Sequence, residues 1–229
     1  KRFIALYGHP SYPALGALGE QSPEESADRA IELAEMYEAH SDEEIHPAFE
    51  IIVTLASEHP GDDGNYSAES DPEDIAEYVE VAEEHDVYVV LDLQPGHADF
   101  LTQARIYEDL LKRPNVGLAL DPEWRLSEGQ VHMEQIGSVS AAEINETTEW
   151  LAELTEENDL PQKMVILHQF RQSMIRGREQ VNTDHSELAM VLHADGHGSA
   201  QDKFATWDLL REDLPDDMRM AWKNFYRQD

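Results

Sequence analysis

The sequence predicts an α/β fold, a (β/α) barrel of the TIM type, and three observations lead to this prediction. Seven strand-sized apolar runs alternate with amphipathic helical stretches along the 229 residues. The runs are continuously apolar, which is typical of strands buried on both faces of a parallel sheet. The spacing between successive runs, roughly 25–45 residues, leaves room for a helical crossover in each unit.

The predicted strands cover seven segments of the chain. They span residues 2–8, 49–56, 87–93, 116–121, 163–169, 187–194 and 219–225. An open doubly wound sheet is the alternative, but neither a G-x-G-x-x-G turn nor a P-loop follows the first strand. Seven strands are one fewer than a complete barrel has, so either an eighth lies beyond Asp229 or the barrel is incomplete. No linker divides the chain, and we expect one domain over residues 1–229.

The predicted helices lie between these strands. The first begins with Ser22 as N-cap, Pro23 at the first helical position and Glu25 three residues after the cap, which together predict a capping box. Asp71 begins the second helix in a similar way. Further helices are expected in the stretches that start ADFLTQAR, SAAEINET and SAQDKFAT. Residues 171–186 are expected to form a loop with a short helix.

The charge of the chain limits its partners. It carries 49 acidic and 16 basic residues, a formal net charge of −33. Binding to nucleic acid requires clustered lysine and arginine, so we expect no nucleic-acid partner. The acidic residues fall mostly on the predicted helices and indicate a salt-adapted surface, as in proteins of salt-tolerant organisms. Because salt screens self-repulsion, we expect stability to rise with salt concentration.

Apolar segments and cysteine usage narrow the class further. No apolar run reaches the ~20 residues that a transmembrane helix needs, so the sequence predicts none. The absence of cysteine excludes disulfides, zinc–thiolate sites and cysteine nucleophiles. This composition fits an exported protein of a Gram-positive bacterium.

Polar residues gather at the carboxyl-terminal end of nearly every predicted strand, where parallel barrels place their active sites. In chain order they are Tyr7, His9, Ser57, Glu58, Asp92, Gln94, Asp121, Glu123, Trp124, Arg125, His168, Gln169, Arg171, His193, Asp195, His197, Lys223, Asn224 and Tyr226. Capping or pairing with a neighbour can explain any one of them. The whole set is better explained by a ligand pocket.

Glycoside hydrolysis is the chemistry that this set fits best. It needs one carboxylic acid to protonate the leaving oxygen and a second carboxylate as nucleophile or as base toward water. Glu123 lies two residues beyond Asp121, so on an extended strand end both point to the same side. A carboxylate neighbour raises the proton affinity of its partner, which makes Glu123 the expected general acid and Asp121 the residue that tunes it. Asp92 or Asp195 is the expected partner carboxylate.

The remaining pocket residues are expected to bind the carbohydrate. They are Tyr7, His9, Gln94, Trp124, His168, Gln169, His193, Trp222 and Lys223. Trp124 can stack on a sugar ring, as can Tyr7, Trp222 or Tyr226. Ordinary packing against the following loop is the alternative explanation for Trp124. For Lys223 an ion pair is expected rather than a Schiff base.

The segment LDPEW resembles the end of the D-x-E signature of chitinase-like glycoside hydrolases. There the glutamate is the proton donor and the preceding aspartate positions the acetamido group of the substrate. The match covers Asp121, Glu123 and Trp124. Residues 117–120 lack the upstream acidic residues of the fuller signature, so the substrate-assisted mechanism is not carried over.

A broader resemblance runs along most of the chain. The segments ALYGHP, YVVLDLQPG, DFLTQA, VGLALDPEWRL, QIGSV, LPQK, LHQF and WKNFY resemble an actinobacterial family of secreted proteins and lipoproteins with a glycoside-hydrolase-like TIM barrel. The resemblance implies an extracellular or cell-surface protein, with a lipoprotein anchor upstream as one route to the surface. It also implies a polysaccharide or cell-envelope context, and it assigns no catalytic residue.

Two other functions stay open. A metal-dependent hydrolase would use His168, His193 and Asp195, with His197 nearby, since imidazole and carboxylate ligands suit zinc or manganese. Loss of activity with EDTA and rescue by a divalent ion would favour it. A non-catalytic carbohydrate-binding barrel would bind a glycan without turnover. The leading interpretation needs no metal and no cofactor. The absence of a nucleotide-binding motif argues against a nucleotide cofactor, and the absence of a G-x-S-x-G elbow argues against a serine hydrolase.

Overall fold

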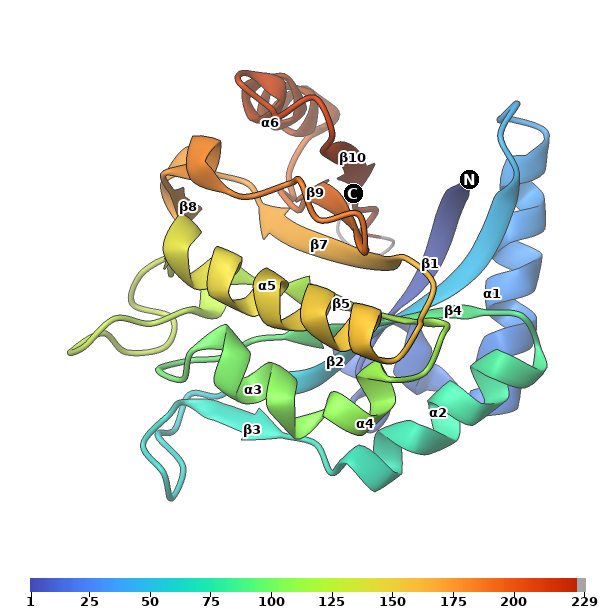
Figure 1. Ribbon diagram of the computed structural model, residues 1–229, viewed down its shortest axis with the longest axis horizontal. Coiled ribbons are helices and arrows are strands. Elements are labelled where there is room, and N and C mark those ends of the chain that lie inside the picture. Colours follow the sequence, from blue (N-terminus) through green and yellow to red (C-terminus); the bar gives the residue numbers. More distant parts are fainter. Residues whose placement is uncertain (226–229) are drawn as a thin grey trace.

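Seven parallel strands form one curled sheet at the centre of the structure, a computed structural model that describes residues 1–225 (Figure 1). The strands follow one another across the sheet in chain order. They are β1 (Arg2–Gly8), β2 (Ile45–Ala56), β4 (Tyr88–Leu93), β5 (Val116–Leu120), β7 (Lys163–Gln169), β9 (Leu188–Ala194) and β10 (Arg219–Trp222). The predicted α/β class and all seven predicted strands are confirmed.

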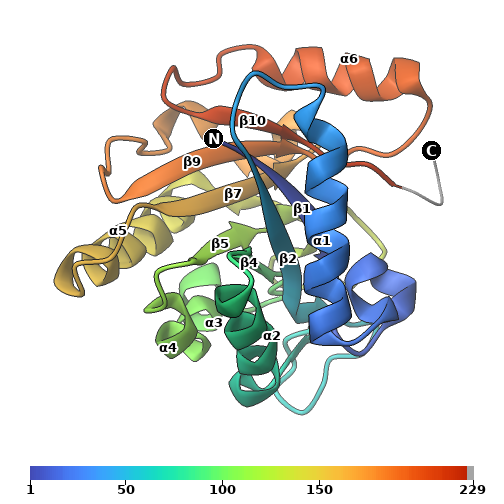
Figure 2. The same cartoon turned by 90° about the vertical axis from the view of Figure 1, so that its right-hand side faces the viewer.

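Six α-helices within residues 1–225 pack around the outer face of this sheet (Figure 2). They are α1 (Pro23–Glu38), α2 (Pro72–Glu84), α3 (Phe100–Ile106), α4 (Glu108–Leu111), α5 (Ala141–Glu157) and α6 (Ala200–Arg211). A doubly wound sheet would need helices on both faces, so the curled arrangement is barrel-like instead. None of the six helices is both long and apolar enough to cross a membrane.

The helix starts follow the predicted capping chemistry. The Ser22 hydroxyl accepts a hydrogen bond from the Glu25 N–H at 3.3 Å, and the Glu25 carboxylate accepts one from the Ser22 N–H at 3.1 Å. This reciprocal pair confirms the capping box, which satisfies two N–H groups that have no partner inside the helix. Asp71 caps α2 by accepting from the Glu73 N–H at 2.9 Å.

The third predicted helix is wrong in one respect, because two short helices replace it. Tyr107 separates α3 from α4 and is fully buried. Its hydroxyl donates to the carbonyls of Val53 at 2.7 Å and Ser70 at 2.9 Å. These long-range bonds hold the chain inward at Tyr107 and interrupt an apolar periodicity that otherwise continues through this residue.

Several short elements were not predicted. They are the strands β3 (Ser67–Glu69), β6 (Val139–Ser140) and β8 (Ile175–Arg176), and 3₁₀ turns at Pro13–Leu15, Ala17–Glu20 and Pro122–Trp124. Residues 171–186 form a loop, as expected, and it contains two 3₁₀ turns, Gln172–Met174 and Arg178–Gln180, where one short helix was predicted. β3 pairs antiparallel with β2, and β6 pairs with β8 outside the main sheet. Elements of two to four residues are too short to produce a recognisable hydrophobic period.

The two faces of the sheet bury different sets of side chains. On β2, Phe49, Ile51 and Val53 are fully buried in the large core between the sheet and its helices. Successive residues of a strand point to opposite faces, so Glu50 and Ile52 point into the interior of the curled sheet. Burial on both faces explains why the strands read as continuous apolar runs.

The interior of the curled sheet changes from apolar to polar along the strands. A small separate cluster fills its middle: Val90, Ala119 and Ile166. Two residues further along the same three strands come Asp92, Asp121 and His168, all buried. Since side chains two residues apart share a face, these three form a polar layer above the apolar one. The sequence thus places titratable groups inside the sheet near its carboxyl-terminal end.

The sheet stops short of a fully hydrogen-bonded barrel. No backbone pairing joins β1 to β10 in the part of the chain that the structure describes, and within residues 1–225 the main sheet has no eighth parallel strand. The carboxyl-terminal ends of these two edge strands nevertheless approach each other, because the Lys223 ammonium lies 3.9 Å from the centre of the Tyr7 ring. Side chains therefore connect the two edges at the end that carries the polar layer.

Candidate active site

A cavity of about 600 Å³ opens at the carboxyl-terminal ends of the parallel strands. Its volume lies within the ~300–1,000 Å³ that is typical of ligand pockets. Each of the seven parallel strands of the main sheet contributes to its wall, through Tyr7 of β1, Leu55 of β2, Gln94 after β4, Asp121 after β5, Phe170 after β7, Asp195 after β9 and Lys223 after β10. The strand ends therefore meet around one hollow.

The segment after β5 supplies two carboxyl groups and an indole to this wall. Residues 121–123 are not extended as expected: the strand ends at Leu120, and a 3₁₀ turn follows (Pro122–Trp124). Asp121 caps this turn by accepting a hydrogen bond from the Glu123 N–H at 3.0 Å. Asp121, Glu123 and Trp124 all line the cavity despite the tighter backbone.

Gly137 holds this turn in place by close backbone contact. Its N–H donates to the Glu123 carbonyl at 2.7 Å. A Cβ at this position would lie 2.5–2.6 Å from the carbonyl oxygens of Pro122, Glu123 and Arg125, so no larger residue fits without moving the turn. The glycine of the QIGSV segment is thus required by the position of the two acidic side chains.

His168 lies at the centre of the polar layer, with no exposed surface. Its Nε2 lies 2.6 Å from a Glu50 carboxylate oxygen, and its Nδ1 lies 2.7 Å from an Asp195 carboxylate oxygen. Burial alone would lower the pKa of His168, but the two carboxylates outweigh it and raise that pKa well above its usual range. His168 is therefore a buried imidazolium that donates a hydrogen bond to each carboxylate.

Lys223 binds the other side of Asp195. Its ammonium lies 3.0 Å from one Asp195 carboxylate oxygen and 3.3 Å from the other. Although burial opposes it, the positive charges of Lys223 and His168 hold the pKa of Asp195 well below its usual value. Asp195 is therefore ionised at the cavity wall, in contact with two cations.

Three other carboxyl groups of the site have the opposite tendency. Burial raises the pKa of Asp92 to about 6. Burial also raises the pKa of Asp121 well above its usual value. Burial, followed by the negative charge of Asp195, raises the pKa of Glu123. Each of these groups holds its proton more firmly than a free carboxyl group.

The charges of the polar layer explain this contrast. Two cations, His168 and Lys223, balance two anions, Glu50 and Asp195. A further ionised carboxylate would be a buried charge without its own cation, which is energetically costly. The wall of the same cavity thus holds one carboxylate whose pKa is lowered, Asp195, and two carboxyl groups whose pKa is raised, Asp121 and Glu123.

The interior also contains two groups of side chains that can hold a metal ion. His193 is buried, and its ring packs edge-on against His168 with the ring centres 4.7 Å apart. Ligand atoms of Glu50, His168 and His193 lie within 4.8 Å of one another, and so do those of Asp121, His168 and Asp195. Burial, followed by the charge of His168, lowers the pKa of His193 to about 4. The neutral ring keeps a lone pair available for a metal.

Aromatic rings form much of the cavity wall. Trp124 lines it and stacks on His132, with ring centres 4.9 Å apart and an angle of 19° between the planes. Phe170 and Phe225 line the same cavity. Tyr226, expected as a further stacking residue, lies outside the described residues. Aromatic faces beside carboxyl groups are typical of sites that bind polar rings.

Gln169 was expected in the pocket but is not among the residues that line it. Its side-chain amide donates to the Arg171 carbonyl at 3.0 Å, and its carbonyl oxygen accepts from the Arg178 guanidinium at 2.8 Å. Gln169 follows His168 directly on β7, so it points to the opposite face of the sheet. It orders the loop after β7 instead.

His9 and Trp222 are also not among the described residues that line the cavity. The Nδ1 of His9 accepts a hydrogen bond from the Ser11 N–H at 3.0 Å, within the turn that follows β1. Trp222 packs against Phe204 and Trp207, with ring centres 5.4 and 5.7 Å away. Both rings stabilise the surroundings of the site rather than its wall.

Glu50 is the charged residue of the polar layer that was not predicted from the sequence, and the cavity-lining rings of His132, Phe170 and Phe225 were not predicted either. The polar residues predicted for the second strand were Ser57 and Glu58, which follow it, whereas Glu50 lies inside the strand. The available signal was a lone carboxylate among apolar neighbours in AFEIIV, which is unusual for a strand buried on both faces. Such a residue needs a buried partner, and His168 is that partner.

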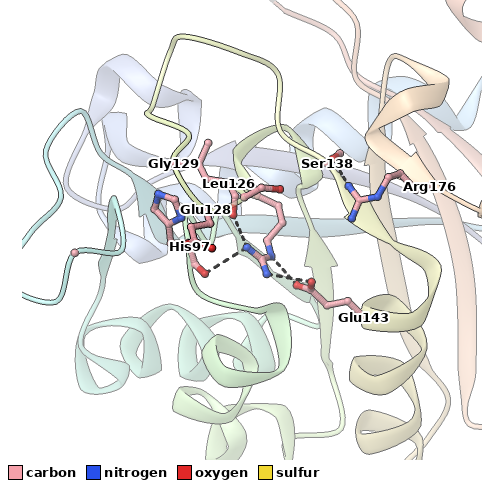
Figure 3. Close-up of a pocket in the computed structure, with 10 residues that line it drawn as sticks. His97, Leu126, Glu128, Gly129, Ser138, Glu143 and Arg176 are labelled. Atoms are coloured by element: carbon pink, nitrogen blue, oxygen red, sulfur yellow. Dashed lines mark hydrogen bonds and ion pairs between the residues drawn. The ribbon is translucent and has the colours of Figure 1, made fainter.

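A second cavity, of about 540 Å³, lies beside the loop that follows β5 (Figure 3). Arg125 turns away from the first cavity and pairs with Glu143 of α5 at 2.8 Å. The same guanidinium donates to the carbonyls of His97 at 3.3 Å and Leu126 at 2.6 Å. Because these partners occupy most of its donors, Arg125 anchors the loop rather than binding a ligand.

No protein-family model matches this chain, and a search of curated proteins finds no match to its sequence. The chemistry of the larger cavity is therefore the basis for a functional assignment. This cavity combines a carboxylate with a lowered pKa, carboxyl groups with raised pKa values, a lysine and aromatic rings. Such a combination is suited to acid–base chemistry on a polar organic ligand.

Proposed function

We propose that this protein is a glycoside hydrolase that acts on a polysaccharide or a cell-envelope glycan. Glu123 is the general acid in this proposal, and Asp195 is the partner carboxylate. The observation that carries it is a pair of carboxyl groups on one cavity wall whose pKa values are shifted in opposite directions: that of Glu123 is raised and that of Asp195 is lowered. Glycosidases need this pair, one group protonated and one ionised.

The neighbours of each group support these roles. Glu123 is partly exposed to the cavity, so its proton can reach a leaving oxygen, whereas Asp121 is buried beneath it and caps its turn. Lys223 and His168 keep Asp195 ionised. The ionised Asp195 can then act in one of two ways. As a nucleophile it attacks the sugar ring, and as a base it removes a proton from the attacking water molecule.

Substrate binding is assigned to the cavity wall. Trp124 presents a large aromatic surface of the kind on which sugar rings stack. Gln94 and Arg171 line the same hollow and can donate hydrogen bonds to hydroxyl groups. The strongly acidic surface of the chain gives no reason to expect nucleic acid in this cavity.

The proposal includes the fold type and the location of the protein. Seven parallel strands with helices outside support a (β/α) TIM-type barrel that lacks one strand within residues 1–225. The resemblance to secreted actinobacterial proteins and lipoproteins supports an extracellular or cell-surface location. Detection of the protein in the medium or on intact cells would test the location, and detection only in the cytosol would contradict it.

A glycan panel assayed with matched variants tests the proposed reaction. Glu123→Gln should reduce kcat/KM by about 100-fold or more, because general acid catalysis contributes roughly 10²–10⁴-fold. Asp195→Asn should also abolish turnover. Glu128→Gln removes an exposed carboxylate of the same loop and should leave turnover unchanged. Equal turnover by the wild type and Glu123→Gln would remove Glu123 from the mechanism.

The same panel separates an enzyme from a carbohydrate-binding protein. Glycan binding without turnover by the wild type, and no gain in affinity in Glu123→Gln, would favour a non-catalytic barrel. For an active enzyme, the anomer released first identifies the role of Asp195. Retention of configuration assigns it as nucleophile, and inversion assigns it as base.

A further inference from the structure

Beneath the cavity, three side chains from three strands meet in the interior of the sheet. Glu50 of β2, His168 of β7 and His193 of β9 are each at least nine-tenths buried. A Glu50 carboxylate oxygen and one ring nitrogen from each histidine lie within 4.8 Å of one another. His168 and His193 are direct neighbours across the β7–β9 pairing, so the backbone itself fixes the two rings side by side.

One of these side chains has a buried polar atom without a partner. The Nδ1 atom of His193 is inaccessible to solvent and makes no hydrogen bond within residues 1–225. Nearby, Asp92 has a carboxylate oxygen in the same condition. Buried polar atoms are nearly always paired, so an unpaired one calls for an ion or a water molecule that completes it.

We propose that Glu50, His168 and His193 bind one divalent transition-metal ion of the zinc class. Two imidazoles and a carboxylate are a ligand set that zinc uses in proteins, with further positions left for water. Magnesium and calcium prefer oxygen ligands alone and are excluded by the two ring nitrogens. This ion lies deeper than Glu123 and goes beyond the proposed hydrolysis, so its binding can be measured without a glycan.

Asp195 has a defined place in this arrangement. Metal-binding histidines usually donate their second ring N–H to a carboxylate, which orients the ring. His168 already does so, since its Nδ1 lies 2.7 Å from Asp195 while its Nε2 faces Glu50 at 2.6 Å. On binding, Nε2 releases its proton to solvent and bonds the metal, and Nδ1 keeps its proton and its bond to Asp195.

The alternative group of Asp121, His168 and Asp195 is less suitable. It provides a single imidazole, and the Lys223 ammonium lies 3.0 Å from Asp195. A metal ion bound there would be close to a fixed positive charge, which repels it. His197, considered from the sequence as a neighbour of a metal site, lines the cavity and belongs to neither group.

Calorimetric titration of the chelator-treated, dialysed full chain with zinc chloride tests the proposal, with elemental analysis of the dialysed complex for stoichiometry. We expect one zinc ion per chain and no binding of magnesium. Loss of an orienting partner alone weakens metal binding by about 10–100-fold, so Glu50→Gln and His193→Ala should weaken it by about 100-fold or more. His185→Ala is the matched control, because His185 lies in the segment before β9, away from the strand end that carries His193, and this variant should bind zinc like the wild type.

Several results of the zinc titration would count against the site. No zinc bound to the wild type, or equal binding by His193→Ala, would overturn the proposal. Zinc binding that Asp121→Asn abolishes and Glu50→Gln leaves intact would also overturn it, in favour of the other group. If His193→Ala does not fold, the wild type loaded with cobalt decides: visible absorption of imidazole-bound four- or five-coordinate cobalt is expected, and the spectrum of octahedral aqueous cobalt would refute the site.

Discussion

Replacing Asp92 by asparagine should stabilise the protein at neutral pH. Asp92 is fully buried, and its pKa is about 6 in the folded protein against an ordinary value of 3.8. Above pH 6 the folded state must ionise a group that the unfolded state ionises more easily. Asparagine resembles the protonated acid, keeps an oxygen that can accept from the Tyr7 hydroxyl, and has no charge to bury.

The size of the effect follows from the two pKa values. A rise of about 2 pKa units, at 1.36 kcal/mol for each unit, corresponds to a gain of about 3 kcal/mol for Asp92→Asn above pH 6. Because the pKa is raised in the folded state, the wild type has no such penalty below pH 4. The advantage of the variant should therefore grow between about pH 4 and pH 6 and stay constant above.

Urea unfolding of both proteins across this pH range, at constant high salt, measures the difference in unfolding free energy. Asp195→Asn provides the contrast, since it leaves His168 and Lys223 without their shared carboxylate and should destabilise the protein at pH 7. A difference between Asp92→Asn and the wild type that does not change with pH would refute the reasoning. A variant less stable than the wild type at pH 7 would refute it as well.

Three further outcomes are expected. The decline of kcat/KM at alkaline pH should occur above pH 4.5, the ordinary pKa of glutamate, because the pKa of Glu123 is raised. In Lys223→Met this decline should move to still higher pH, since Lys223 lowers the pKa of Glu123, and an unchanged pH profile in the variant would contradict the assignment. Lys223→Met should also lower the unfolding free energy by about 3–5 kcal/mol, since Asp195 loses its buried cation, whereas Lys112→Met, which breaks only exposed ion pairs, should change it little in the same urea assay. The melting temperature should rise from low to molar sodium chloride, and a flat response would show that surface repulsion is unimportant.

The sheet could be predicted closely because burial on both faces leaves a strong sequence signal. The predicted and observed bounds agree at residues 2–8 and 163–169, and the remaining strands differ by a few residues at their ends. The helix break at Tyr107 could not be predicted, since its cause is a pair of hydrogen bonds to residues far away in sequence. The 3₁₀ turn after Leu120 was hidden for a similar reason, because Gly137 fixes it from a distant segment.

The candidate site was predictable where residues follow a strand and less so inside one. Asp121, Glu123 and Asp195 line the cavity because parallel strands end at one edge of the sheet. Alternation along the strand, which the sequence analysis did not apply to Gln169, would have excluded it from the pocket, since its neighbour His168 points inward. Glu50 was missed for a different reason. It lies inside a strand whose residues were all interpreted as apolar core, so a residue of the site was left out rather than wrongly included.

The open seam between β1 and β10 has a consequence for how this protein can change over evolution. In a fully paired cylinder the backbone would set the diameter of the mouth, and side chains at its rim could be exchanged freely. Here Lys223, in contact with both Tyr7 and Asp195, spans the gap where backbone pairing is missing. Selection on the charge of Asp195 and selection for contact between the two edge strands therefore act on the same residue, Lys223, and its replacement would affect both.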